Sequence, residues 1–373
     1  MIRVAAALCA LGVCVGAAAA SRPSPQAQAQ ADGCATGAPW AYVGDAAAPA
    51  AAPAPPPQWV TGVARVRPSG GELVLDVPGG ELAGTVNAAG RLEVRREATP
   101  WFAWPEQGDR VTALGSWVWS CGTPGTERTE LHPFRALWVQ RGFSARSPTG
   151  EAEGDLYISP DATAAGLSAE CAHRAKADAA VYAACRATSV SLGVAGDYSF
   201  TLTAPPRPRA AGPLAVRIVD QGGGGPDPTV TIAGSAAKVT LHLTADAVVA
   251  KQVFLGWTNV PKPALPEHLK VRFRSLVVRS QAGPWILFWD AAGIWGPWKG
   301  KQALDVYVPR RTAWRFGATA QGGLEGVVSD RYASPEAALG LHHGLPLALT
   351  AGCPAGANPK GCYQLDYVVT RVG

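Results

Sequence analysis

The sequence lacks the short motifs that mark several well-known catalytic and nucleotide-binding sites. It contains no GxSxG nucleophile elbow, no phosphate-binding loop and no dinucleotide-binding fingerprint. The four glycines at 222–225 precede no helical pattern, so we expect a turn between strands there. No CxxC pair occurs, which removes the commonest zinc-binding pattern. Paired carboxylates that meet only in three dimensions, as in glycosidases, leave no such trace and stay open.

Charge is also sparse and dispersed. Charged residues make up 16% of the chain and the formal net charge is +5, without a basic run of five or more. Proteins that bind phosphate backbones usually concentrate their cations, so no nucleic-acid partner is predicted. The predicted loops are poor in acids, which disfavours calcium. Adjacent His342 and His343 would point in opposite directions in an extended segment, and we predict no metal site and no cofactor.

Long apolar runs are missing after the first residues. Residues 1–20 begin with MIR, continue with an apolar run from Val4 to Val15 and end in small residues, the order found in secretory signals. Cleavage is expected near Ala20 and Ser21. No later run reaches the 18 or more apolar residues that a transmembrane helix needs. The sequence therefore predicts a secreted, periplasmic or cell-surface protein without a transmembrane segment in its mature chain.

Six cysteines remain after that signal segment. An even number of cysteines in an oxidising compartment suggests disulfide bonds. Short spacing favours pairing Cys171 with Cys185 and Cys353 with Cys362, and elimination then pairs Cys34 with Cys121. The last pair would stabilise the attachment of the N-terminal segment by about 2–4 kcal/mol.

Local patterns predict a mainly β chain with five parts. Short β-prone runs broken by Gly, Pro and Asn indicate an OB-like barrel first and a C2-like or jelly-roll β-sandwich later. An Ala-rich stretch at 161–187 has helical spacing and would be a short helical insertion linked by its own disulfide. The predicted parts are a signal peptide at 1–20, an Ala/Pro/Gln-rich segment and linker with Cys34 at 21–58, the barrel at 59–143, a connector with the helix at 144–188, and the sandwich at 189–373.

One stretch of the predicted barrel resembles a known pattern. The sequence GDRVTALGSWVWSCG, followed by TELHP, is similar to a GxWVxxCG…TE[IL]HP motif in a family of exported bacterial proteins. The match covers roughly residues 100 to 140. It implies export and architecture, and it brings no activity with it. Ser120 and Thr123 stand where the family often has Asp and His, so a role that needs that pair is not expected.

The same motif holds the first candidate site. Glu130 and His132 are two residues apart in a predicted strand, so they would share a face. A carboxylate beside an imidazole can orient it and raise its pKa, which suits acid–base catalysis or metal ligation. The alternative is structural, with both residues at the barrel end and Pro133 ending the regular ladder.

The second candidate site is the aromatic stretch WILFWDAAGIWGPW at 285–298. Trp289 lies in a predicted strand, whereas Trp295 and Trp298 follow a turn and precede two lysines. Exposed indoles beside cations could stack on sugars or meet a membrane surface. Core packing is the competing interpretation.

These patterns favour non-catalytic binding of a glycan, lipid or protein ligand outside the cytoplasm. Strands and tryptophans are plentiful, whereas recognisable catalytic constellations are missing. The rival hypothesis is a secreted hydrolase with its site around Glu130 and His132, and the third is a structural envelope protein.

Overall fold

The protein is described from a computed structural model. The described residues are 40–42, 57–65, 72–77, 91–95, 100–106, 108–120, 129–160, 193–278, 286–292, 294–297, 299–309, 314–321, 327–332 and 363–372. Across these ranges the chain is mainly β, which confirms the predicted class. The same ranges include two 3-10 helices, η1 (Trp101–Ala103) and η2 (Lys262–Ala264). None of the helices found there has the length and apolar character needed to cross a membrane.

The first half of the chain builds most of a nine-stranded sheet. Its N-terminal strands are β1 (Trp40–Tyr42), β2 (Gln58–Ala64), β3 (Glu72–Asp76), β4 (Arg91–Arg95), β5 (Arg110–Ser120) and β6 (Thr129–Arg141). Strand β2 pairs antiparallel with β3 and β5, and β3 pairs with β4. Strand β4 pairs parallel with β6, which also pairs antiparallel with β5. A buried cluster lies among these strands and includes Val60, Leu75, Val111, Leu131 and Val139.

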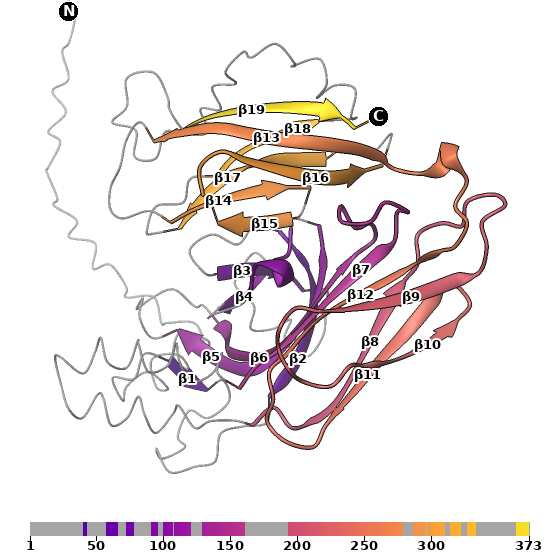
Figure 1. Cartoon of the computed structure of the whole chain (residues 1–373). Helices are drawn as coiled ribbons and strands as arrows, with labels where there is room; N and C mark the ends of the chain where they lie inside the picture. The colour runs from indigo at the N-terminus through magenta and orange to yellow at the C-terminus, as the bar shows by residue number, and fades with distance from the viewer. Residues whose placement is uncertain are drawn as a thin grey trace, which may run out of the picture.

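Three further strands extend that sheet beyond β6. They are β7 (Ala152–Ile158), β12 (Val249–Trp257) and β9 (Leu214–Asp220), in that spatial order. A separate sheet contains β8 (Gly196–Thr203), β10 (Thr229–Ala233) and β11 (Ala236–Leu243). Alternate apolar residues of β7 and β12 pack against β8 and β11 in one core, which includes Leu156, Val253, Phe200 and Val239. Figure 1 shows β8, β10 and β11 as a pink layer beside the nine-stranded sheet.

The C-terminal strands form two smaller sheets. One contains β13 (Glu267–Val278), β16 (Gln302–Val308) and β19 (Tyr363–Arg371). The other contains β14 (Ile286–Ala291), β15 (Ile294–Pro297), β17 (Trp314–Gln321) and β18 (Val327–Tyr332). In Figure 1 these orange and yellow strands lie above the rest of the chain.

The strand partners differ from the predicted division in two places. Strand β7 lies within 144–188, which the sequence pattern assigns to a connector, because EAEGDLYI alternates charged and apolar residues without a strong β run. Strands β9 and β12 join the N-terminal strands instead of a separate C-terminal unit. The predicted signal segment, helix and all six cysteines lie outside the described residues.

Candidate functional site

Four of the predicted site residues fall on three strands. Glu130 is on β6, across from Val118, and is only 3% exposed. His132 is on the same strand, but its side chain is outside the described part. Trp289 on β14 and Trp295 on β15 belong to neighbouring strands of one sheet, and their side chains are likewise not described. Trp298 is outside the described residues, so the proposed pairing and aromatic platform stay predictions.

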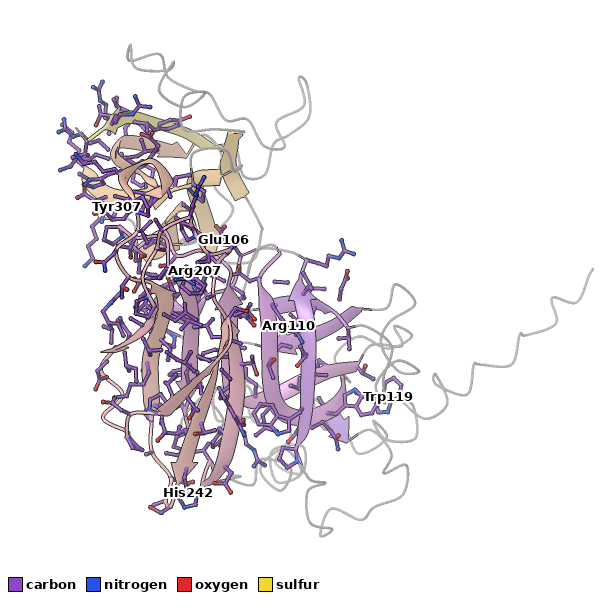
Figure 2. The ribbon with its side chains drawn as sticks, turned by 90° about the vertical axis from the view of Figure 1, so that its right-hand side faces the viewer. Glu106, Arg110, Trp119, Arg207, His242 and Tyr307 are labelled. Carbon is purple, nitrogen blue, oxygen red and sulfur yellow. The ribbon has the colours of Figure 1, made fainter. Side chains whose placement is uncertain are left out.

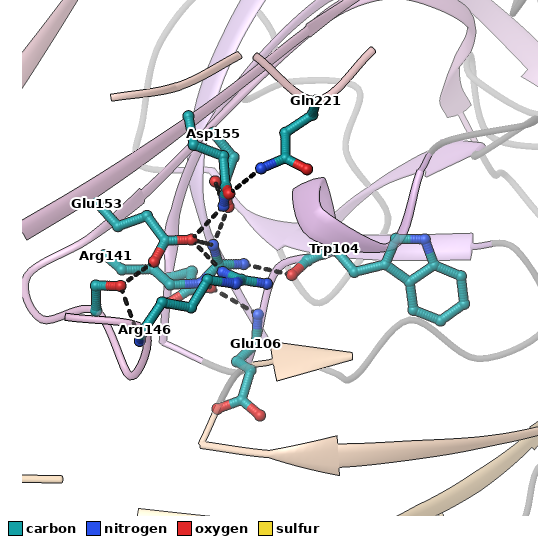
Figure 3. A network of polar contacts seen from close by, with 10 residues as sticks. Trp104, Glu106, Arg141, Arg146, Glu153, Asp155 and Gln221 are labelled. Carbon is teal, nitrogen blue, oxygen red and sulfur yellow. Dashed lines mark hydrogen bonds and ion pairs between the residues drawn. The ribbon is translucent and has the colours of Figure 1, made fainter. Parts of the chain in front are cut away.

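A buried charge network forms instead where β6, β7 and β12 run side by side (Figure 3). Arg141 ends β6 and lies directly across from Glu153 on β7. Asp155, two residues later, points to the same face and lies across from Gln252 on β12. Glu153 and Asp155 are completely buried, and Arg141 is 6% exposed. These positions place one guanidinium between two carboxylates inside the fold.

Arg141 connects several elements. Its Nη1 donates to Glu153 Oε1 at 3.2 Å and also to Asp155 Oδ2. Its Nε lies 3.1 Å from Asp109 Oδ2, just before β5, and its Nη2 donates to the Trp104 carbonyl after η1. One side chain therefore fastens the start of β5 and the end of η1 to β7.

Glu153 and Asp155 receive different partners. Arg146 Nη1 and the Ser144 hydroxyl donate to Glu153, in addition to Arg141. The Gln252 amide donates to Glu153 Oε1 at 2.9 Å and to Asp155 Oδ1 at 2.8 Å. Glu153 thus contacts two guanidinium groups, whereas Asp155 contacts one.

The partners determine which carboxyl keeps its proton. Burial, followed by the adjacent Glu153 carboxylate, raises the pKa of Asp155 to about 8, although Arg141 and Arg146 act in the opposite direction. Burial also opposes ionisation of Glu153, but Arg146 and Arg141 together hold the pKa of Glu153 below its ordinary value. Because Glu153 has the additional guanidinium, we assign the charge to Glu153 and the proton to Asp155.

The rest of the network then balances its charge near neutral pH. Burial raises the pKa of Asp109 to about 6 against the attraction of Arg141, so Asp109 is ionised at pH 7. Burial alone would lower the pKa of Arg141, but Asp155, Asp109 and Glu153 raise it above its ordinary value. Two cations, Arg141 and Arg146, face two anions, Glu153 and Asp109. Pairing of this kind offsets part of the cost of burying the charges.

This network fixes the loop that joins β6 to β7. Ser144 and Arg146 belong to the loop and bind Glu153, while the Ser144 amide donates to the Glu151 carbonyl at 2.8 Å. Farther along, the Ser147 hydroxyl donates to Glu151 Oε2 at 2.7 Å. The Ala145 carbonyl accepts a hydrogen bond of 2.9 Å from the Tyr307 amide of β16. The loop is therefore anchored to β7 and to the C-terminal strands.

The anchored loop forms one wall of a cavity of about 230 Å³. Phe143, Thr149 and Gly150 of this loop face residues from the β8–β9 and β12–β13 connections. Prolines are the commonest lining residues: Pro205, Pro206, Pro208, Pro266 and Pro309. We call this cavity the proline pocket. Proline restricts the backbone at these positions, so the walls have little conformational freedom to lose on binding.

Trp257 holds the opposite wall together. Its indole N–H donates to the Pro205 carbonyl at 2.8 Å, and the Arg207 guanidinium carbon lies 5.1 Å from the centre of its ring. Arg207 also donates to the Ala211 carbonyl at 2.8 Å. Figure 2 shows Arg207 in this region, between the upper sheets and the nine-stranded sheet. The indole presents an apolar surface whose polar atom is already satisfied.

The lining of the proline pocket suits binding better than catalysis. The described residues that line it include no acid, base or thiol, and Thr149 supplies the hydroxyl. Glu153 and Asp155, which have the perturbed pKa values typical of catalytic groups, are buried in the neighbouring network instead. Nor do the described residues contain a group of three or more His, Cys, Asp or Glu arranged for a metal ion.

The sequence alone does not reveal the proline pocket or the buried charge network, because each is formed by segments far apart in the chain. The segments PPRPR and PKPALPE are visible as turn signals, but only the fold brings them together in the lining of one pocket. Glu153 and Asp155 show the spacing of a strand face, yet their partners lie on β6 and β12. Comparisons with protein-family models, curated proteins and solved structures found no match.

Proposed function

We propose that this is an exported, non-catalytic binding protein that takes an apolar group of an extracellular or envelope ligand into the proline pocket. The observation that carries the proposal is a cavity with rigid apolar walls and no titratable lining residue. A volume of about 230 Å³ suits a ring or a branched side chain better than a whole drug-sized ligand. The ligand would therefore be a larger molecule that presents one such group.

Preorganisation supports this proposal. The charge network fixes the Phe143 wall, and the Trp257 hydrogen bond fixes the Pro205 wall. A pocket whose walls are already ordered avoids the entropic cost of ordering them during association.

The proposed export and fold have their own support. A secretory pattern at 1–20 and an even number of later cysteines favour an oxidising compartment, with pairs Cys34–Cys121, Cys171–Cys185 and Cys353–Cys362. Strands β2 to β6 form an OB-like barrel in this proposal, supported by the pairings β2–β3, β3–β4, β4–β6, β6–β5 and β5–β2. The shared core between β7–β12–β9 and β8–β11–β10 supports a sandwich beside it.

The test compares two substitutions that add the same side chain. Ala264→Trp fills the pocket from η2, and Ala233→Trp adds an indole at an exposed position of β10. Calorimetry would screen the full mature chain against neutral glycans, phosphatidylcholine vesicles and peptides that carry apolar side chains. We expect at least one class to bind wild type and Ala233→Trp, and to lose affinity for Ala264→Trp. Equal binding by both variants, or no binding by any class, would reject the pocket as the site.

The hydrolase alternative has weaker support. Glu130 is buried and has an interaction partner, so it does not meet solvent in this structure. Turnover of generic ester, peptide or phosphate substrates that disappears in Glu130→Gln would overturn the non-catalytic proposal. Counting thiols in the denatured mature chain tests the disulfides separately, because all six cysteines should resist alkylation until a reductant is added.

A further inference from the structure

One face of the sheet β16–β13–β19 has a row of cations. His268, Lys270, Arg272 and Arg274 occupy alternate positions of β13, whereas Leu269, Val271 and Phe273 between them are buried. His268, Lys270 and Arg272 therefore lie on the face of the sheet that is turned away from its core, and Arg274 follows at the register shift between Phe273 and Ser275. Arg272 and Arg274 are exposed, and Lys270 is half-buried.

The strand register identifies the residues of β16 and β19 that lie beside this row. Across from β13, strand β16 places Tyr307, Asp305 and Ala303 beside His268, Lys270 and Arg272. The exposed residues Lys299 and Lys301 come just before β16 in the chain. Strand β19 contributes Thr370 and Val368 beside Lys270 and Arg272, and its Asp366 pairs with Ser275, the residue after Arg274. We call this surface the basic face.

Little on the basic face neutralises these cations. Asp305 Oδ1 accepts a hydrogen bond of 3.1 Å from His268 Nε2, so its carboxylate is already engaged. None of the described residues forms an ion pair with Lys270, Arg272 or Arg274. In Figure 2, nitrogen-tipped side chains gather near Tyr307, over the orange and yellow strands. Unpaired, exposed cations of one sign attract anionic partners.

The geometry of the row indicates an extended partner. Alternate residues of a strand are separated by about 7 Å, so the row from His268 to Arg274 spans about 20 Å. Each arginine can donate two parallel hydrogen bonds to a carboxylate, sulfate or phosphate group. A linear polymer with repeated anionic groups could follow such a row along its whole length.

The aromatic pair at one end favours a polymer made of sugars. The Tyr307 ring stacks on His268 with a centroid distance of 4.6 Å and an interplanar angle of 20°. A flat ring surface of this kind can pack against the C–H face of a sugar. Peripheral membrane binding gains strength from a wide exposed apolar surface. At this end of the described chain the large apolar side chain that is exposed is Val372, which favours a sugar polymer over a membrane.

We propose that the basic face binds an acidic polysaccharide. The choice of a polysaccharide over a nucleic acid rests on the proposed export, whereas the anionic character rests on the face itself. The site is separate from the proline pocket, because none of the pocket's lining residues belongs to the row.

The experiment compares two triple variants, each of which loses three positive charges. Lys270→Gln, Arg272→Gln and Arg274→Gln together neutralise the row, while Lys238→Gln, Arg209→Gln and Lys262→Gln remove the same charge from exposed positions on other elements. Calorimetry on the full mature chain would use polygalacturonate, dextran sulfate, neutral dextran, phosphatidylglycerol vesicles and a single-stranded oligonucleotide. We expect wild type to bind both acidic polysaccharides, to ignore neutral dextran, and to lose affinity as salt is raised.

The two triple variants give opposite expected results. The row variant should lose about 100-fold in affinity at low ionic strength, because each Lys or Arg near an anionic surface contributes about 1 kcal/mol to binding. The control variant should stay within about twofold of wild type, since its charges lie elsewhere. Equal losses in both variants, or no loss in either, would overturn the basic face as the site. Tighter binding to the vesicles or the oligonucleotide would overturn the polysaccharide assignment. Ala264→Trp should keep this binding, which separates a failure here from a failure of the pocket proposal.

Discussion

The strongest prediction contrasts two carboxyl groups on one strand. Glu153→Gln and Asp155→Asn make the same chemical change on the same face of β7, two residues apart. Glu153 carries the charge that faces Arg141 and Arg146, whereas Asp155 keeps its proton at neutral pH. Removing one partner from a buried ion pair costs about 3–5 kcal/mol, so we expect Glu153→Gln to lose that amount of unfolding free energy.

The expected effect of Asp155→Asn is much smaller. With a pKa of about 8, Asp155 is mostly protonated at pH 7. An asparagine amide has nearly the same shape and can donate toward Glu153 in place of the carboxylic acid. The unfolding free energy should therefore change by less than about 1.5 kcal/mol, the scale of one neutral hydrogen bond.

Thermal unfolding followed by near-ultraviolet circular dichroism at pH 7 measures both variants. A loss of 3–5 kcal/mol corresponds to a midpoint lowered by roughly 10 °C for a folded unit of this size. Asp155→Asn should unfold within about 4 °C of wild type on the same scale. If Asp155→Asn were as damaging as Glu153→Gln, the proton assignment within the network would be wrong.

Three other predictions concern the same region. Arg141→Leu should lower the unfolding free energy by about 3–5 kcal/mol, because Asp109 and Glu153 lose a buried partner. The control Arg209→Leu changes an exposed arginine and should leave the denaturation midpoint unchanged. Similar losses in the two variants would contradict the role of burial. Because the pKa values of Asp155 and Asp109 are raised, the folded state keeps protons that the unfolded state has released. The unfolding midpoint should therefore fall as pH rises from about 5.5 to 8. This fall should be shallower in Asp155→Asn. The lowered pKa of Glu153 acts the other way, so below its unfolded pKa of about 4.5 its contribution is lost as pH falls; a midpoint that rises steadily up to pH 8 would refute this account. Gly154→Ala should lower stability by about 1–3 kcal/mol in urea unfolding, because a methyl group there collides with the Trp138 indole, whereas Gly142→Ala adds its methyl group to open space and should be neutral.

Much of the strand content follows from local patterns. Runs such as residues 72–77 and 129–139 combine β-branched or aromatic residues with turn signals at both ends, and they coincide with β3 and β6. Strand β7 is harder to predict because Glu153, Gly154 and Asp155 have low β propensity. Their placement depends on partners in β6 and β12 that compensate for the burial of two carboxyl groups.

The candidate sites illustrate the same limit. A search for consecutive basic residues overlooks β13, because its cations alternate with Leu269, Val271 and Phe273 and gather only when the strand is extended. The proline pocket joins residues more than a hundred positions apart, so no local pattern reports it. Glu130 and His132 are visible in the sequence, but spacing does not tell whether a carboxylate meets solvent, and Glu130 is buried.

The long strand β6 has a practical consequence for dissecting the chain. Its residues from Thr129 to Gln140 pair with β5, and Ala136 to Arg141 also pair with β7, so one continuous strand belongs to both neighbouring assemblies. A fragment that stops at residue 143 would expose the backbone donors and acceptors on this side of β6, a common cause of aggregation. Strand β7 in turn requires β12, which comes almost a hundred residues later. Expression of the N-terminal strands as an autonomous module should therefore fail unless the fragment continues through Trp257.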